Sequence, residues 1–167
     1  IYPVYEDLVD LFLDLAGERG MDFFFGTYDS ATWPTAPRSI EADVDLGRAF
    51  CDEVWETYGQ RPAFRGWYLT FELGRLARRR VRGLRQLGAH VKQLSPALPT
   101  LISPYVHGRK LVDDPVSVEA HHKDWDEILA TLEGVVDIVA FQDGQMAYDE
   151  LPEFLAANRQ LIAAHGM

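Results

Sequence analysis

Polar and aromatic side chains follow each of four apolar segments of the sequence, and residues of these types are suited to binding a sugar. Glu72 comes at the end of the aromatic segment from 64 to 71, while Gln142 and Asp143 follow the segment from 135 to 141. Carboxylates and amides bind sugar hydroxyls, and aromatic rings stack on the apolar face of a pyranose. Glycoside cleavage needs one carboxyl group to protonate the leaving oxygen and a second to attack or to activate water. The candidate site residues are Tyr28, Trp33, Tyr68, Glu72, Tyr105, Gln142 and Asp143.

Each of these side chains also has a purely structural interpretation. Glu72 is either a general acid or a carboxylate in the first turn of a following helix, where the helix dipole favours it. Asp143 precedes Gly144 and is typical of a turn. Gln142 is a better polar ligand than a core residue, because a buried amide must be satisfied. The aromatic rings taken singly are typical of packing, and Trp67, inside an apolar segment, most of all.

Helices and strands are predicted to alternate along the chain and to position these residues. Apolar periodicity predicts helices at 4–19, 41–58, 73–94, 118–133 and from residue 152 onward, and apolar runs predict strands at 21–26, 64–71, 100–103 and 135–141. Strands that alternate with helices pair in parallel, so their carboxyl ends share one edge, where α/β proteins usually place their sites. Four strands fit either part of a (β/α)8 barrel or a small, open, doubly wound sheet, which is the default architecture for 167 residues.

Two further expectations concern the helices. Inner faces are expected to include Leu46, Ala49, Phe50 and Val54 in the second helix, and Phe154, Leu155, Leu161 and Ile162 in the last. A stripe of arginines is expected to lie on a solvated face or against an acidic neighbouring helix rather than on phosphate. Its members are Arg75, Arg78, Arg79, Arg82 and Arg85.

The composition predicts a single α/β domain over residues 1–167 and argues against several partners. A net charge of −10 argues against nucleic acid and against an anionic membrane surface. No apolar run approaches the length of a membrane span, and no Walker, Gly-x-Gly-x-x-Gly or Gly-x-Ser-x-Gly motif is present. His121 and His122 diverge on a helix, and the single Cys51 excludes a multi-cysteine zinc site, so neither metal nor cofactor is expected.

Four motifs in order carry a resemblance to a known family. They are Gly26 after an apolar strand, Gly-Trp-Tyr-Leu-x-x-Glu at 66–72, Ile-Ser-Pro-Tyr at 102–105, and Asp-Ile-Val-Ala-x-Gln-Asp-Gly at 137–144. The sequence resembles the domain of unknown function 4434 family, which is similar to glycoside hydrolases on a TIM barrel. The resemblance implies that the four strands are the third to sixth of a larger (β/α)8 barrel, of which this chain is a fragment. Flanking sequence or a second chain would supply the missing strands.

The same resemblance implies a role for Glu72. In retaining glycosidases of the related barrel clan the acid/base glutamate ends the fourth strand, as Glu72 would, and the nucleophile lies on the seventh strand, after this chain ends. Phe71 stands where that clan usually has Asn. The first hypothesis is therefore a glycoside-hydrolase-like domain that acts on or binds a carbohydrate, cleaving an O-glycosyl bond through Glu72. The alternative is a non-catalytic glycan- or protein-binding domain on a barrel scaffold.

Several properties are left open by the sequence. It gives neither the glycan and its linkage nor the stereochemical outcome. The compartment is also open, although the family resemblance favours a secreted or cell-envelope protein.

Overall fold

The computed structural model describes residues 6–28, 39–110 and 115–167. Five helices and four strands alternate in these ranges, as the periodicity predicts. The helices are α1 (Leu8–Glu18), α2 (Ile40–Tyr58), α3 (Arg78–Leu94), α4 (Val118–Leu132) and α5 (Leu151–Ala164). The strands are β1 (Phe23–Gly26), β2 (Phe64–Tyr68), β3 (Thr100–Ile102) and β4 (Ile138–Val139).

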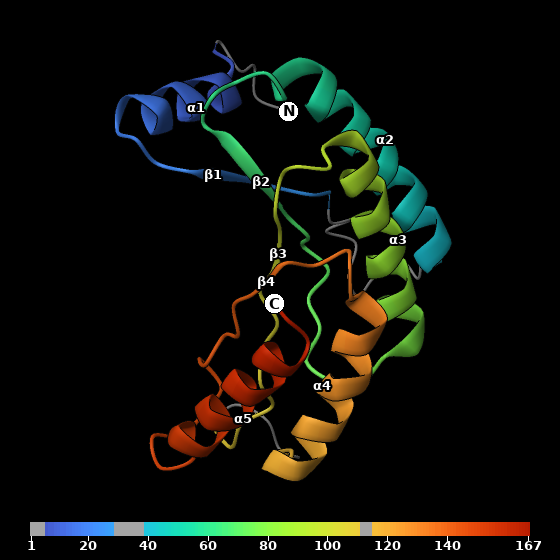
Figure 1. The fold of residues 1–167 in the computed structure, drawn as a ribbon, viewed down its shortest axis with the longest axis vertical. Coiled ribbons are helices and arrows are strands. Elements are labelled where there is room, and N and C mark those ends of the chain that lie inside the picture. Colours follow the sequence, from blue (N-terminus) through green and yellow to red (C-terminus); the bar gives the residue numbers. More distant parts are fainter. Residues whose placement is uncertain (1–5, 29–38, 111–114) are drawn as a thin grey trace.

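The strand order identifies the architecture as part of a barrel. All four strands are parallel, and they lie side by side in chain order, β1-β2-β3-β4. A doubly wound sheet reverses its strand order at a switch point and has helices on both faces. Here α2, α3 and α4 form the convex side of a crescent and the strands lie along its inner side (Figure 1). The open-sheet alternative is therefore wrong, and the partial (β/α)8 barrel is confirmed.

The core fills the space between the strands and the outer helices. Trp67 of β2 is fully buried, and its indole N–H donates a hydrogen bond to the Ser95 hydroxyl at 2.8 Å. Its ring packs beside Phe25 of β1 and Trp55 of α2. Burial raises the pKa of the Cys51 thiol to about 12, so this cysteine acts as a small core residue. The expected packing role of Trp67 is confirmed.

The arginine stripe lies along the seams between the outer helices. Arg78 of α3 forms two hydrogen bonds of 2.9 Å with Glu127 of α4, and Arg79 reaches Glu41 of α2 at 3.3 Å. Arg85 donates to the backbone carbonyl of Glu133 at 3.2 Å. These contacts are exposed, so solvent screens the charges and each contributes little to stability. The expectation of an acidic neighbouring helix is met on both sides of α3.

The segment between β2 and α3 differs from its prediction. Helix α3 begins at Arg78, five residues later than the predicted start at 73, because the backbone from Leu69 to Leu73 is hydrogen-bonded to the β3 segment. The Leu69 N–H donates to Leu101 at 2.8 Å, and the Leu73 carbonyl accepts from Tyr105 at 3.1 Å. A backbone held by these cross-strand bonds cannot also enter a helix.

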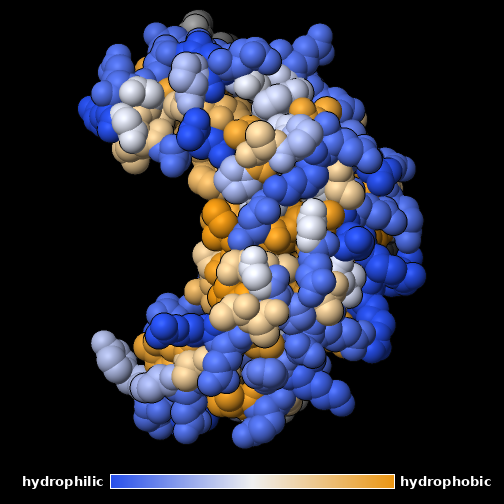
Figure 2. Space-filling model, viewed as in Figure 1, coloured by the Kyte–Doolittle hydropathy of each residue, from blue (hydrophilic) through white to orange (hydrophobic). Residues whose placement is uncertain are grey.

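Some predicted inner faces are also wrong. Leu46 and Leu155 are 43% and 54% exposed, and Ala49 is exposed as well, whereas Val54, Phe154 and Leu161 are buried. Apolar residues also gather along the wall of the notch in the crescent (Figure 2). In the part of the chain that the structure describes, no helix combines the length and apolarity needed to span a membrane.

Candidate functional site

The carboxyl ends of the four strands form one continuous edge. The Thr27 N–H, just after β1, donates to the Tyr68 carbonyl at the end of β2 at 2.8 Å. Tyr105, after β3, donates its N–H to Leu73 at 3.1 Å and pairs on its other side with Gln142, after β4. Backbone bonds therefore connect the polar segments that follow the four strands. The sequence-based expectation of a shared edge is met.

Glu72 lies on this edge, on the face away from the helices. Leu69 and Phe71 are buried, and both pack against α3, where their side chains approach Gly88 and Gly83. Side chains alternate along an extended segment, so Glu72 faces the opposite, inner side. Glu72 is exposed, and within the described ranges no cation is paired with it. Because α3 begins only at Arg78, the helix-dipole interpretation of Glu72 is wrong.

Two other candidates come from the β1 and β2 side of the edge. Tyr68 is half-buried and shares the inner face with Thr70, since a Cβ on Gly26 would contact both side chains. Thr70 in turn donates its hydroxyl to the Thr27 carbonyl at 2.8 Å, which fixes this part of the edge. Tyr28 is 37% exposed, and its ring packs beside Phe50 of α2 rather than beside Tyr68. Trp33 lies outside the described residues.

The remaining candidates come from the β3 and β4 side. Gln142 is exposed, and its amide donates to the Ser103 carbonyl at 2.5 Å, so this amide also holds the two loops together. The Asp143 carboxyl is exposed, and its backbone carbonyl accepts from Met146 at 2.9 Å. The turn interpretation of Asp143 therefore describes its backbone, while its side chain stays accessible. Tyr105 and Gln142 are brought together by direct pairing.

His107 belongs to the same edge and was missed by sequence reasoning. Its ring lies beside that of Tyr105, with centroids 5.2 Å apart, and both rings cover the backbone of Gly74. The His107 carbonyl accepts from Val116 at 3.0 Å, which anchors the loop that carries it. The only signal in the sequence was a histidine two residues after a candidate tyrosine.

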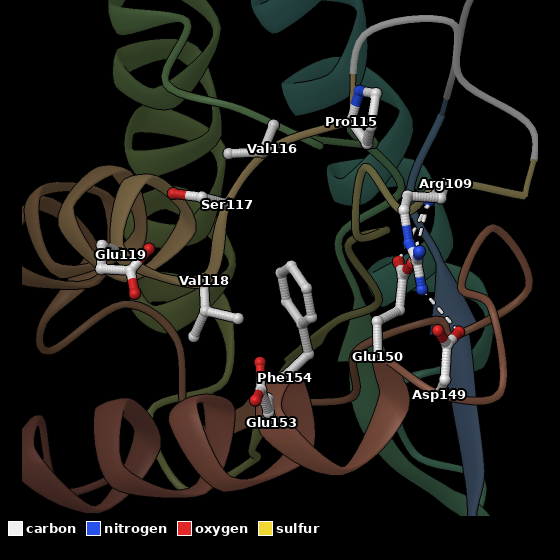
Figure 3. Close-up of a pocket in the computed structure, with 10 residues that line it drawn as sticks. All are labelled: Arg109, Pro115, Val116, Ser117, Val118, Glu119, Asp149, Glu150, Glu153 and Phe154. Carbon is white, nitrogen blue, oxygen red and sulfur yellow. Dashed lines mark hydrogen bonds and ion pairs between the residues drawn. The ribbon is translucent and has the colours of Figure 1, made fainter.

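A cavity of about 470 Å³ opens next to this loop, between the N-terminal ends of α4 and α5 (Figure 3). Its polar wall includes Arg109, which is paired with Asp149 at 2.5 Å and with Glu150 at 2.6 Å. Hydrogen bonds to these carboxylates raise the pKa of Arg109, and Arg109 lowers the pKa of Asp149. Glu119 and Glu153 complete the acidic lining. These residues were also missed, because each alone resembles ordinary surface charge.

Metal ligation is the remaining chemical possibility at the edge. Over residues 6–28, 39–110 and 115–167, no group of three or more His, Cys, Asp or Glu side chains is arranged to hold a metal ion. The functional groups present along the edge are carboxyl, amide, imidazole and phenol groups.

The fold that carries this edge is similar to that of solved structures. A crystal structure of a candidate alpha-L-fucosidase from Bacteroides thetaiotaomicron is 39% identical, with a TM-score of 0.91 over 99% of this chain. The intracellular xylanase of Thermoanaerobacterium saccharolyticum is 15% identical, with a TM-score of 0.60 over 100% of this chain, and its complex with xylotriose has a TM-score of 0.59. The chain spans 52% of the first structure and 59% of the second. No curated protein matches the chain.

The fold is thus that of a partial glycoside-hydrolase-like TIM barrel. The strand order, the single layer of outer helices and the similarity to both structures agree on it. The family description of domain of unknown function 4434 matches residues 1–167, which is the whole sequence. The chain therefore belongs to the domain of unknown function 4434 (DUF4434) family.

Proposed function

We propose that this chain forms the part of a glycoside hydrolase that binds a carbohydrate along its carboxyl edge, with Glu72 as the general acid/base. The position of Glu72 supports this proposal: it is an exposed carboxyl group on the inner face, four residues after β2 ends at Tyr68. In TIM barrels, catalytic groups come from strand ends on this face. Tyr68, Tyr105, Gln142 and Asp143 lie along the same edge and would bind the sugar.

The reaction assigned to Glu72 is proton transfer at the glycosidic oxygen. The protonated carboxyl group donates to the leaving oxygen. In a retaining reaction a second carboxylate attacks the anomeric carbon at the same time, and the Glu72 carboxylate then takes a proton from the water that cleaves this glycosyl-enzyme bond. In an inverting reaction the second carboxylate instead takes a proton from the water that attacks the anomeric carbon directly. A second carboxyl group is required, about 5–5.5 Å away for retention and about 6.5–9.5 Å away for inversion. Among the described residues, Asp143 is the candidate for this second carboxyl group, although β3 lies between its strand and that of Glu72. The alternative is a carboxyl group supplied from outside this chain.

The test is the Glu72→Gln variant in the full-length protein. Its substrates are a 4-nitrophenyl alpha-L-fucoside and xylotriose, which follow from the two similar structures. We expect kcat to fall by roughly 100-fold or more, with binding retained, because the amide keeps the shape but cannot donate the proton. The matched control is Glu56→Gln, an exposed carboxyl on the outer helix α2. Full turnover by Glu72→Gln would exclude the role.

The competing outcome is a domain that binds glycan without cutting it. In that case the wild-type protein would retain a glycan in a binding assay and release no product over long incubation. Turnover that is lost in Glu72→Gln supports the hydrolase, whereas glycan binding without any turnover supports the non-catalytic domain.

A further inference from the structure

Two aromatic rings occupy the space beside the backbone of Gly74. A Cβ added to Gly74 would overlap the Tyr105 ring and lie 2.5 Å from Nε2 of His107. Any other residue at this position would push both rings away, so a glycine here is what permits the close approach. The rings themselves lie at 34° to each other, with centroids 5.2 Å apart.

The position of Gly74 places these rings next to Glu72. From Leu69 to Leu73 buried and accessible side chains alternate, as they do on an extended segment, and Gly74 follows at a bend. Gly74 lies two residues after Glu72, within about 7 Å along the backbone, so the rings that cover Gly74 lie near Glu72. Both rings come from the segment that follows the neighbouring strand β3.

Close contacts also hold the residues that follow His107 in its loop. A Cβ on Gly108 would overlap the Gln145 carbonyl and lie 2.5 Å from Oε1 of Glu150. The Arg109 N–H donates to the same carboxyl group at 3.0 Å. His107 is half-buried between these two contacts. The contacts of Gly108 and Arg109 hold the backbone that follows His107, while Tyr105 and Gly74 lie against its ring. A side chain placed in this way before a ligand arrives loses less freedom on binding, which lowers the entropy cost.

We propose that His107 and Tyr105 form a positioning pair for a neutral sugar unit next to Glu72, which rests on the proposed function of that edge. The phenol ring offers an apolar face to the pyranose, and the imidazole offers a hydrogen-bond partner to one hydroxyl. The net charge of −10 disfavours an acidic sugar, because like charges repel.

The test measures binding and turnover separately in the full-length protein. The dissociation constants of xylotriose and of a 4-nitrophenyl alpha-L-fucoside are measured by calorimetry in the Glu72→Gln background, so binding is observed whether or not Glu72 is catalytic. We expect His107→Ala to weaken binding of one probe by 10-fold or more, and His107→Gln to restore part of it. In the parent protein, His107→Ala should raise KM more than it lowers kcat.

The controls separate positioning from folding. His122→Ala, on the exposed face of α4, should change neither constant. Gly74→Ala displaces the rings without altering His107 and should weaken the same probe. If His107→Ala lowers the unfolding temperature strongly, Tyr105→Leu, which removes the ring face, and Gly74→Ala decide the question.

The outcomes bear on the two proposals separately. Unchanged dissociation constants in His107→Ala and Gly74→Ala, with turnover still lost in Glu72→Gln, would overturn the positioning pair and leave the proposed function standing. Failure of both probes to bind the wild-type protein would also overturn the pair. Full turnover in Glu72→Gln, with binding still dependent on His107, would remove only the catalytic role.

Discussion

At the scale of single residues, Asp143 has a structural role through its backbone and a proposed binding role through its side chain. Its backbone carbonyl closes a turn with Met146 at 2.9 Å, while its carboxyl group is exposed at the end of β4. Glu72 follows β2, and β3 lies between these two strands. Two strand spacings correspond to about 10 Å between backbones, so side chains from both could approach one sugar from different sides.

Asp143→Asn is expected to raise KM about 5- to 10-fold and to leave kcat nearly unchanged, because a neutral amide is a weaker partner for sugar hydroxyls. Steady-state kinetics of the full-length protein provide the measurement. Asp45→Asn, an exposed carboxyl on α2, is the matched control. A drop in kcat as large as that of Glu72→Gln would instead make Asp143 the second catalytic carboxyl group.

Candidate site residues could be predicted from the sequence only where the pattern of a short segment was sufficient. Glu72 could be placed on the edge because a charge after an aromatic strand stands out within one short segment. His107 and Gly74 could not be paired in advance, since 33 positions separate them and their contact depends on how two loops pass each other. The acidic cavity beside Arg109 depends on the same long-range packing.

At the scale of elements, the alternation of helices and strands was predictable, but not which residues face inward. The period of apolar residues marks a helix, yet Leu46 and Leu155 satisfy that period and are exposed. The elements that pack against a helix determine which of its faces is buried, and those elements are distant in sequence. The late start of α3 has the same origin, since Tyr105 takes the carbonyl of Leu73.

Helices α4 and α5 are joined at their C-terminal ends by His165. Its Nδ1 lies 2.8 Å from a Glu133 oxygen, and its Nε2 lies 3.0 Å from an Asp126 oxygen. Hydrogen bonds to Glu133 and then Asp126 raise the pKa of His165 above its ordinary value of about 6.5. A raised histidine pKa means that the charged form is stabilised by folding, so the stabilisation is fully present below pH about 6.5 and is lost as the pH rises through the raised pKa.

His165→Asn is therefore expected to destabilise the protein more at pH 5.5 than at pH 9. The difference in free energy of unfolding should be about 1 kcal/mol, since both carboxylates are more than half exposed and solvent screens them. Thermal or denaturant unfolding of both proteins at the two pH values provides the measurement, with His122→Asn as the control. An equal loss at both pH values would show that His165 contributes by packing alone.

At the scale of the whole molecule, the crescent leaves apolar surface uncovered at both tips. Leu8 and Phe12 of α1 are each 50% exposed at one tip (Figure 1). An apolar cavity of about 440 Å³ at α5 includes Phe141 and Leu155 at the other. Ile138 of β4, 37% exposed, lies on the sheet between them. Surfaces of this kind mark contact sites, and a barrel closes by covering such tips with further βα units.

We therefore expect that the full-length protein buries both tips against additional barrel elements. Phe12→Glu and Leu155→Glu should each lower its free energy of unfolding by about 2–3 kcal/mol, because each would remove an apolar side chain from an interface and bury a charge. Denaturant unfolding of the full-length protein provides the measurement. Glu56→Gln, on the outer side of α2, should have no effect. Unchanged stability in both variants would mean that the tips stay open to solvent, and a barrel completed at these two helices would be excluded.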